Sequence, residues 1–545
     1  MIFKRLAFVV LSIFMGTYTF PCTVIVVGKK ASKDGSVIIS HTDTGEDSRF
    51  KIVFGKKFKP GEMAPVFWGI QDSKLALDDD GKIIGYIPQV EQTYTYIHSA
   101  YSHINEYQLA IAESTTSQRD ELIAFLGEGD QIMTIEQAQI FALQRYKTAK
   151  EAVLFIGRLM ETYGFLPSSG DGSEALVIAD VNEAWVFEVF GVGKGWKKDS
   201  GKAGAIWAAQ RVPDDHVGII PNQSIIKEIN IKDKANFLVS KNYIQFAIDK
   251  GWYNPKGNMP FIWQDVYAPL PHEWATGRFW YFYSKVAPNY YNWPDRSLKD
   301  NHLKGYDAYH QTVEPISIYP FSVKPEMKLS VQDVIDFQRT TFKGTIYDKT
   351  ADTDWYISDG KDGSKLSPLA TPFPTKAMRE LLDITRRRNI ARPMGNYGMV
   401  VQLRDWLPNE IGGVYWVYVD NQYTSPYVPI YAGNQSIADC YQIYNPEEYS
   451  DKSMRWAVDF IDNLMYLQWQ EAVKDLWAVR DPFEKEMFDR QADIEKQAMD
   501  LYKYDPQKAK EFLTDYSNSK MEEAFKMFVD LRATMIVKYT NNKLN

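Results

Sequence analysis

The chain has 545 residues, of which 45% are hydrophobic and 24% are charged, and its net charge is −8. These proportions are ordinary for a globular protein, and the length is sufficient for a large core or several layers of secondary structure. Proteins that bind nucleic acids usually present a basic face, so the acidic charge balance argues against a nucleic-acid partner.

The first 21 residues have the pattern of an export signal. Lys4 and Arg5 precede a mostly apolar run that ends at Met15 and is too short to span a membrane. No later stretch reaches the ~18 apolar residues of a membrane-spanning helix. We therefore expect residues 1–21 to be a signal peptide and the protein to be exported, either periplasmic or secreted. Lipidation of Cys22 is the alternative that the sequence favours less.

Cys22 follows this segment directly, and its position suggests a chemical role. Cleavage just before Cys22 would leave a thiol and a free α-amine on one residue. The amine has an ordinary pKa of about 7.7–8.0 and can act as a base, and the deprotonated thiol is a strong nucleophile. One residue would then supply nucleophile and base, as in N-terminal-nucleophile hydrolases. We expect the second cysteine, Cys440, to be a buried free thiol, because a disulfide would block the nucleophile.

The residues after Cys22 predict a β-hairpin. Residues 23–27 form a β-branched run typical of a buried strand, and a polar turn with a glycine at each end follows. A second apolar run, residues 37–40, predicts the returning strand. This hairpin would bring His41 and Asp43 back towards Cys22.

Further along the chain, strands and helices are predicted in mixed order. The predicted elements are a strand near residues 109–115, two helices at about 134–148 and 149–163, a hairpin of strands at 176–180 and 184–190, a strand at 203–210, and paired strands at 400–406 and 412–419. Thr134 and Gln137 form a plausible capping box for the first helix. Residues 452–545 have apolar positions spaced by three and four, which predicts two or three long amphipathic helices with turns at Asp481-Pro482 and Asp505-Pro506.

Several motifs along the chain resemble the dipeptidase and secernin family of cysteine N-terminal-nucleophile hydrolases. They are Cys22-Thr23, the Gly-Lys-Lys-Ala-Ser-Lys-Asp-Gly-Ser run of residues 28–36, Asn105-Glu106, the Trp-Ala-Ala-Gln-Arg-Val-Pro-Asp run of residues 207–214, and Asn222-Gln223. The resemblance extends from Cys22 to about residue 433. It implies an α+β fold, the αββα sandwich of these hydrolases, with a C-terminal helical extension. We therefore divide the chain into a signal peptide (1–21), a hydrolase domain (22–445) and a helical region (446–545).

The resemblance also implies a set of site residues. The implied catalytic residues are Cys22, Asp43, Asn105 and Asn222, and the implied substrate-binding residues are His41, Arg211 and Arg278. Cys22 would attack the substrate carbonyl, and Asp43 would orient the α-amine. The Asn222 amide would donate to the developing oxyanion, with Asn105 as the candidate second donor, a role that suits an asparagine side chain.

No motif in the sequence predicts a metal or another cofactor. The seven histidines are scattered without the spacing of metal ligands, and neither His-Glu-x-x-His nor Gly-x-Ser-x-Gly occurs. We expect no cofactor.

The expected function is that of a cysteine dipeptidase that hydrolyses the amide bond of short peptides, and the sequence allows a homo-oligomer. Two alternatives stay open: a related amidase acting on bile-salt, penicillin or N-acyl substrates, and a secreted non-enzymatic protein that binds glycans or peptides. The high aromatic content, 14%, is the feature that the second alternative would use.

Overall fold

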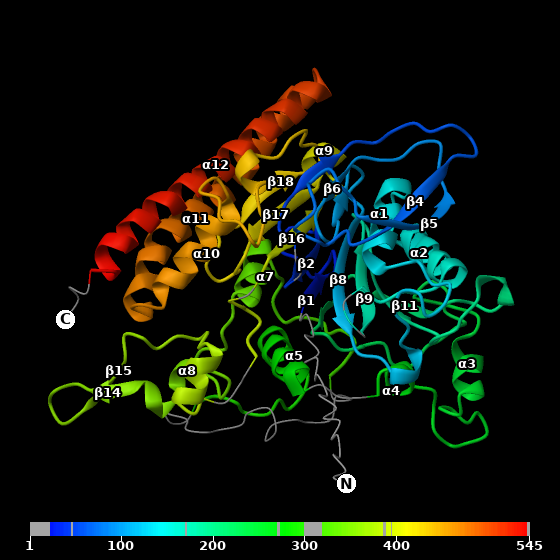
Figure 1. The fold of residues 1–545 in the computed structure, drawn as a ribbon, viewed down its shortest axis with the longest axis horizontal. Helices are drawn as coiled ribbons and strands as arrows, with labels where there is room; N and C mark the ends of the chain where they lie inside the picture. Colours follow the sequence, from blue (N-terminus) through cyan, green and yellow to red (C-terminus); the bar gives the residue numbers. More distant parts are fainter. Residues whose placement is uncertain are drawn as a thin grey trace, which may run out of the picture.

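The computed structural model describes residues 22–44, 47–168, 170, 172–269, 273–298, 319–384, 388–393 and 395–541. The expected signal peptide, residues 1–21, lies outside these described residues. Two antiparallel sheets form the centre of the molecule, with helices on the outer side of each (Figure 1).

The first sheet contains the hairpin predicted after Cys22. Its strands are, in spatial order, β12 (Val217–Ile220), β1 (Thr23–Val27), β2 (Val37–Thr42), β16 (Tyr397–Leu403), β17 (Val414–Val419) and β18 (Val428–Tyr431). Every residue of β1 and β2 is buried. A strand that packs on both faces favours continuous apolar runs of this kind over strict alternation.

The second sheet has eight strands. In spatial order they are β13 (Phe237–Val239), β11 (Ile206–Val212), β10 (Ala184–Phe190), β9 (Ser173–Ala179), β8 (Ala110–Thr116), β7 (Ile104–Asn105), β6 (Tyr96–His98) and β3 (Lys51–Val53). The hairpin of β9 and β10 confirms the prediction for residues 176–190. β8 and β9 lie against β1 and β2, so the two sheets meet face to face.

The layers outside the sheets are helical. α1 (Ile135–Arg145) and α2 (Ala149–Tyr163) cover the eight-stranded sheet and confirm the two helices predicted there. The Thr134 side chain accepts a hydrogen bond from the Gln137 backbone, as expected of an N-cap. α7 (Val331–Gln338), α10 (Met454–Met465) and α12 (Pro506–Tyr539) pack against the six-stranded sheet.

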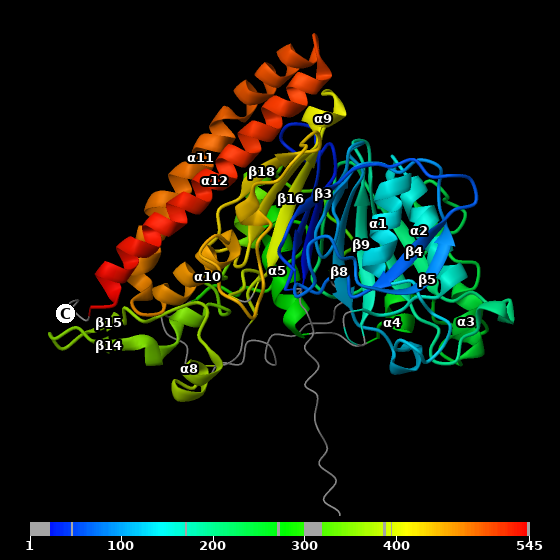
Figure 2. The same ribbon diagram turned by 45° about the horizontal axis from the view of Figure 1, so that its top comes forward.

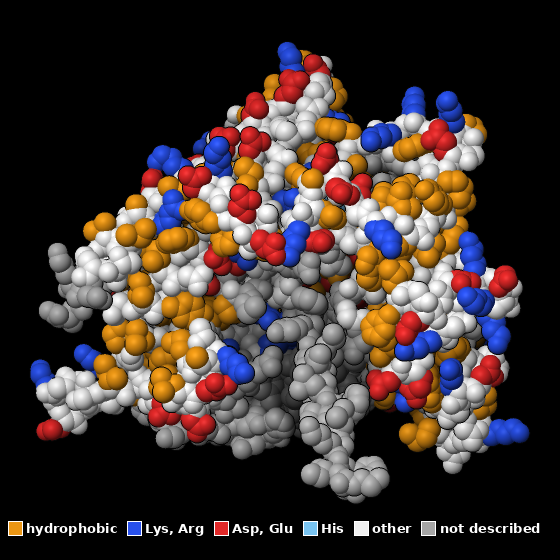
Figure 3. Space-filling view, in the orientation of Figure 1, with side chains coloured by type: hydrophobic (Ala, Val, Ile, Leu, Met, Phe, Trp, Pro, Cys, Tyr) orange, Lys and Arg blue, Asp and Glu red, His pale blue; other side chains and the backbone are white. Residues whose placement is uncertain are grey.

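Shorter elements complete the described part of the chain. They are β4 (Met63–Trp68), β5 (Lys82–Pro88), α3 (Tyr243–Asp249), α4 (Trp263–Tyr267), α5 (Glu273–Val286), β14 (Tyr356–Ser358), β15 (Ser364–Leu366), α8 (Lys376–Leu381) and α9 (Asn409–Gly412). Hydrophobic side chains gather on the surface over the β4–β5 hairpin (Figure 3), and they include Met63, Ile83 and Tyr86.

The C-terminal region corrects one prediction. α11 (Trp469–Tyr502) runs through Pro482, so the turn predicted at Asp481-Pro482 is wrong. A proline removes one helical hydrogen bond, but contacts of the next two residues stabilise the helix. Phe483 is buried, and the Glu484 carboxylate accepts hydrogen bonds from both terminal nitrogens of Arg339 at 2.5 and 2.7 Å. The second predicted turn is confirmed, because Asp505 caps α12 and proline suits the first helical position.

α11 and α12 form a long hairpin that lies across the six-stranded sheet beside β18 (Figure 2). Its buried side chains belong to the same hydrophobic core as the strands. The division at residue 446 stays a prediction. Among the residues that the structure describes, no helix combines the length and hydropathy needed to cross a membrane. Cys440 is a buried free thiol, as expected.

A buried ion pair between Arg404 and Glu495 joins this helical hairpin to the six-stranded sheet. The Arg404 guanidinium, just beyond β16, donates to both carboxylate oxygens of Glu495 on α11 at 2.6 and 2.7 Å, and the two side chains are 5% and 10% exposed. We expect Glu495→Gln to lower the free energy of unfolding by about 3–5 kcal/mol, because it leaves a buried guanidinium without its counter-charge. Urea denaturation monitored by circular dichroism measures this change.

The matched control is Asp530→Asn, which breaks the exposed pair between Lys526 and Asp530 on α12. Exposed pairs contribute about 0–1 kcal/mol. Equal shifts in the two variants would contradict a stabilising role for the buried pair.

Candidate active site

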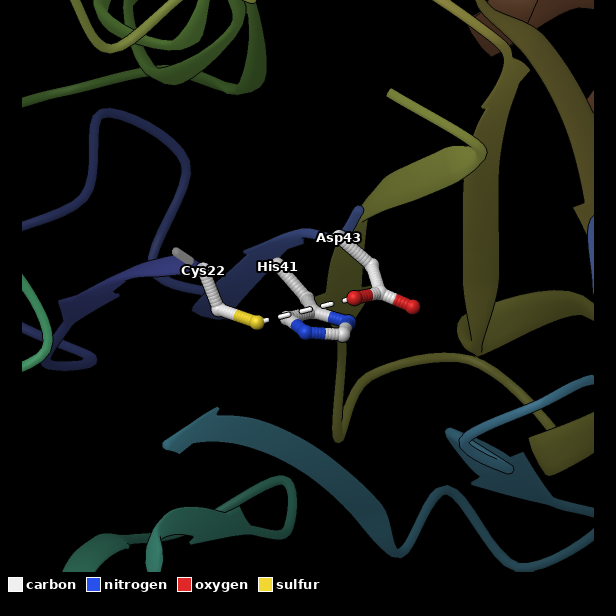
Figure 4. A group of neighbouring side chains, drawn as sticks. All are labelled: Cys22, His41 and Asp43. Atoms are coloured by element: carbon white, nitrogen blue, oxygen red, sulfur yellow. Dashed lines mark hydrogen bonds between the residues drawn. The ribbon is translucent and has the colours of Figure 1, made fainter. Parts of the chain in front are cut away.

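Cys22 lies at the start of β1, and the register of the hairpin determines what faces it. Thr23 pairs with Thr42, so Cys22 lies opposite Asp43, and the Cys22 Sγ atom is 3.6 Å from Asp43 Oδ1. His41 approaches the same thiol from β2 (Figure 4). The structure therefore brings together the three residues that the sequence predicted to meet.

Gly28 begins the turn between the strands, at a position that has no room for a side chain. A Cβ atom on Gly28 would lie 2.4 Å from the Asp214 carbonyl oxygen, a distance that side chains do not tolerate. The Gly28 and Lys30 backbone nitrogens donate to carbonyl oxygens of the segment before β12, at 2.9 and 2.7 Å. This close approach fixes the hairpin against its neighbouring strand at the end of β1 away from Cys22.

Arg278 of α5 holds the backbone at the nucleophile. Its Nη1 atom donates to Cys22 O at 2.8 Å, Thr23 Oγ1 at 2.9 Å and Asn222 Oδ1 at 3.0 Å, and its Nη2 atom donates to Pro221 O at 2.5 Å. The side chain is fully buried. We predicted that Arg278 binds substrate, but its guanidinium donates to four protein acceptors, and the geometry makes it a positioning residue.

Asn222 lies immediately beyond β12 and bridges the two sheets. Its Nδ2 atom donates to Thr115 O at 2.8 Å, and its backbone nitrogen donates to Ser114 Oγ at 3.3 Å. The residue has a φ of 58°, in the left-handed region that asparagine adopts more readily than most residues. Strained backbone of this kind is concentrated at functional sites. The shared contact with Arg278 places Asn222 beside Cys22.

His41 is wholly buried, and a chain of hydrogen bonds through His103 determines that its Nδ1 atom carries a hydrogen. The Nδ1 atom of His103 lies 2.7 Å from the Ile111 carbonyl oxygen, which only accepts, so this nitrogen carries a hydrogen. Burial and the neighbouring His41 ring lower the pKa of His103 well below its ordinary value, so His103 is neutral and its Nε2 atom accepts. His41 Nδ1, 3.2 Å away, must therefore donate.

The other nitrogen of His41 faces an acid. His41 Nε2 is 3.3 Å from Glu113 Oε2. Burial opposes ionisation, but the neighbouring His41 and Glu174 side chains outweigh it and hold the pKa of Glu113 below its ordinary value. The two ring nitrogens of His41 thus face His103 and Glu113, at 3.2 and 3.3 Å. We predicted that His41 binds substrate; the structure places it beneath the thiol, between His103 and Glu113.

Cys22 is buried from solvent, and its surroundings are acidic. Burial, followed by the charges of Glu113 and Asp43, raises the pKa of the Cys22 thiol well above its ordinary value. Burial and Glu113 likewise raise the pKa of Glu174, so Glu174 holds its proton while Glu113 is ionised. The thiol therefore keeps its proton until a base beside it takes that proton.

The Asn105 side chain makes structural contacts at the end of α1. Its Nδ2 atom donates to the carbonyl oxygens of Leu143 and Tyr146, at 2.8 and 2.9 Å, at the end of α1. Its Oδ1 atom accepts from the backbone nitrogens of Tyr107 and Leu109, at 3.0 Å each. Both hydrogens of the amide are committed to these contacts, so the arrangement does not offer a donor to an oxyanion.

Arg211 also lies apart from the thiol. Its guanidinium pairs with Glu183 at 2.8 Å and Asp214 at 2.5 Å. The Asp214 carbonyl oxygen accepts from the backbone nitrogen of Lys30 in the hairpin turn. Arg211 is therefore at the opposite end of β1 from Cys22.

Sequence reasoning missed Glu113, His103 and Arg388. Glu113 carried a usable signal, because it is a charged residue inside the apolar run of β8. His103, just before β7, had no spacing that would have indicated its contact with His41. Arg388 donates from Nη1 to Asn222 Oδ1 at 3.2 Å, a contact between residues 166 positions apart.

Cys22, His41 and Asp43 also present donor atoms within 4.8 Å of one another, which raises the question of a metal. Both nitrogens of His41 are already directed at His103 and Glu113. A metal ion would have to displace one of these partners, so the donor set as arranged does not fit one. The expectation that no cofactor is needed stays a prediction.

Comparison with known proteins extends this description. Residues 21–481 match the model of Peptidase family C69. The chain is 22% identical over 551 residues to a probable dipeptidase B of Streptococcus pyogenes serotype M1, covering 100% of this chain and 99% of that protein. It is 25% identical over 452 residues to a probable dipeptidase B of Lactococcus lactis subsp. lactis, covering 80% and 79%.

A probable dipeptidase A of Streptococcus pyogenes serotype M18 is 24% identical over 449 residues, covering 80% of each chain. The family match begins beside Cys22 and includes both sheets and every residue placed around the thiol. The chain belongs to peptidase family C69.

Proposed function

We propose that this peptidase is a dipeptidase of the N-terminal-nucleophile type, in which Cys22 becomes the first residue. The observation that carries the proposal is the position of Cys22: a buried thiol at the start of a central strand, 3.6 Å from the Asp43 carboxylate. The names of the relatives, probable dipeptidases A and B, support a dipeptide substrate. The order of layers, helices outside two facing antiparallel sheets, supports the αββα sandwich of these hydrolases.

The choice of base follows from the geometry. The ring nitrogens of His41 are directed at His103 and Glu113, and its Nδ1 atom donates to His103. The α-amine that cleavage would create is on the same residue as the thiol, and Asp43 lies opposite to orient it. An amine at this position can take the proton directly, which is the pairing that activates other N-terminal nucleophiles.

The reaction then runs in two halves. Cys22 Sγ attacks the carbonyl carbon while its proton passes to the α-amine, and a tetrahedral oxyanion forms. The oxyanion collapses, the C–N bond breaks, and the α-ammonium returns the proton to the leaving amine. Water, deprotonated by the α-amine, hydrolyses the thioester and releases the free acid and the thiol. Arg278 holds the Cys22 carbonyl throughout, and the Asn222 amide donates to the oxyanion.

Export belongs to the same proposal. A signal peptide that ends at residue 21 would expose the α-amine of Cys22 and place the enzyme outside the cytoplasm, and lipidation of Cys22 would block the thiol. Among the described residues, no contact favours the amidase or the non-enzymatic binder over a dipeptidase. A homo-oligomer stays a prediction.

The first test concerns Cys22. We expect Cys22→Ala to be inactive and Cys22→Ser to keep only a trace of activity, because a hydroxyl is the poorer nucleophile. A form in which cleavage is blocked and residues 1–21 are retained should fold but stay inert, because an amide nitrogen is not a base. Hydrolysis of a dipeptide followed by chromatography measures all three, and a fully active uncleaved form would refute the mechanism.

The second test compares two asparagines that the sequence could not separate. Asn222→Ala should lower kcat roughly 100- to 1000-fold, the usual cost of one oxyanion donor. Asn105→Ala should lower the melting temperature, because it removes buried hydrogen bonds at the end of α1, but its folded fraction should turn over normally. The opposite pattern would transfer the oxyanion role to Asn105.

The third test concerns metals. Because thiol and amine perform the reaction, activity should survive dialysis against a strong chelator. Loss of activity on chelation, with recovery on adding zinc, would mean that Cys22, His41 and Asp43 act as ligands instead.

A further inference from the structure

Two arginines meet at one oxygen atom beside the nucleophile. Asn222 Oδ1 accepts from Arg278 Nη1 at 3.0 Å and from Arg388 Nη1 at 3.2 Å. The same Nη1 atom of Arg278 donates to the Cys22 carbonyl oxygen at 2.8 Å. The Arg388 guanidinium is therefore separated from the nucleophilic residue by two hydrogen-bonding groups.

The two arginines differ in what they can reach. Arg278 is fully buried on α5 and donates to four protein acceptors. Arg388 is partly exposed and lies in the segment between α8 and β16. Of this pair, only Arg388 extends from the site towards solvent.

The remaining charges around the thiol are acidic. Asp43 is 3.6 Å from Sγ, and Glu113 is close enough to influence the ionisation of the thiol. A bound anion would be repelled on this side of the site, whereas a bound cation would be attracted. Arg388, which contacts Asn222, supplies the complementary positive charge.

A dipeptide carries charges that match this arrangement. Its ammonium is attached to the carbon next to the scissile carbonyl, and its carboxylate is attached to the carbon next to the scissile nitrogen. The two charges therefore lie on opposite sides of the bond that breaks. An acidic group on one side and a guanidinium on the other would orient that bond over the thiol, and a guanidinium forks onto a carboxylate with two parallel hydrogen bonds.

We propose that Arg388 binds the C-terminal carboxylate of the substrate and thereby restricts the enzyme to peptides with a free carboxyl end one residue beyond the scissile bond. This inference rests on the proposed dipeptidase function and adds the residue that recognises the leaving half. It also separates a dipeptidase from an N-acyl amidase, whose substrates lack the matching pair of charges.

The test compares substrates with and without the carboxylate, using the processed chain that begins at Cys22. The kcat/KM for alanyl-alanine should fall roughly 10- to 100-fold in Arg388→Gln, mainly through KM, as expected for a lost charged hydrogen bond. The kcat/KM for alanyl-alaninamide should fall much less than that for alanyl-alanine, because the amide has no carboxylate contact to lose. Arg388→Lys should be intermediate, because it keeps the charge but loses the fork.

The matched control is Arg379→Gln. Arg379 is on α8, in the same part of the chain, and donates to the Pro374 carbonyl oxygen at 2.8 Å. The loss of Arg379 should leave kcat/KM unchanged for both substrates. If Arg388→Gln lowers kcat/KM equally for both substrates, Arg388 acts only by holding Asn222 and the proposal is overturned. An unchanged kcat/KM for alanyl-alanine would overturn it as well.

A binding experiment keeps this inference distinct from the proposed reaction. If the wild-type chain hydrolyses neither compound, the dipeptidase function fails, and calorimetry on Cys22→Ala with and without Arg388→Gln decides the role of Arg388. Weaker binding of alanyl-alanine, with binding of the amide unchanged, supports the carboxylate contact. Equal effects on both ligands, or no binding of either, overturn it.

Discussion

The antiparallel register of β1 and β2 is the constraint on which the site depends. Thr23 opposite Thr42 places Cys22 opposite Asp43 and puts His41 beneath the thiol. A slip of one residue would turn every side chain of the strand to the other face. The register is held at the far end by the close approach of Gly28 to Asp214 and at the near end by Arg278, which binds the carbonyl of Cys22.

The second constraint is electrostatic. A buried thiol among carboxylates resists ionisation, and the same carboxylates favour a positively charged amine in its immediate neighbourhood. His41 and Glu113 lie 3.3 Å apart beneath the thiol. Proton transfer within one residue would resolve this situation, because the ammonium that forms would stay next to the sulfur and to the carboxylates that stabilise it. Catalysis and export would then be linked through the same cleavage.

Local patterns in the sequence predicted local structure well. The hairpin after Cys22, the helices after Thr134 and the strands around residue 180 depend on periodicity and capping, which neighbouring residues encode. The proline at 482 misled the prediction because tertiary contacts of Glu484 hold the helix through it. The meeting of Cys22, His41 and Asp43 was predictable because one short hairpin joins them.

Contacts between distant segments were not predictable in this way. The resemblance placed Asn105 and Arg211 in the site, but the first closes the end of α1 and the second pairs with acids at the other end of β1. Glu113 and Arg388 reach the site from β8 and from the segment before β16. Only the packing of the two sheets brings them to the thiol, and no spacing in the sequence encodes that packing.

The proposed mechanism requires the thiol and the free amine of Cys22 to act together, and this requirement can be tested by trapping the covalent intermediate. A slowly released peptide ester would be mixed with the active enzyme, quenched in acid and analysed by mass spectrometry after digestion. We expect an N-terminal fragment that begins at Cys22 and carries the acyl group. Full turnover by a chain that still carries residues before Cys22, or an acyl group attached elsewhere, would contradict it.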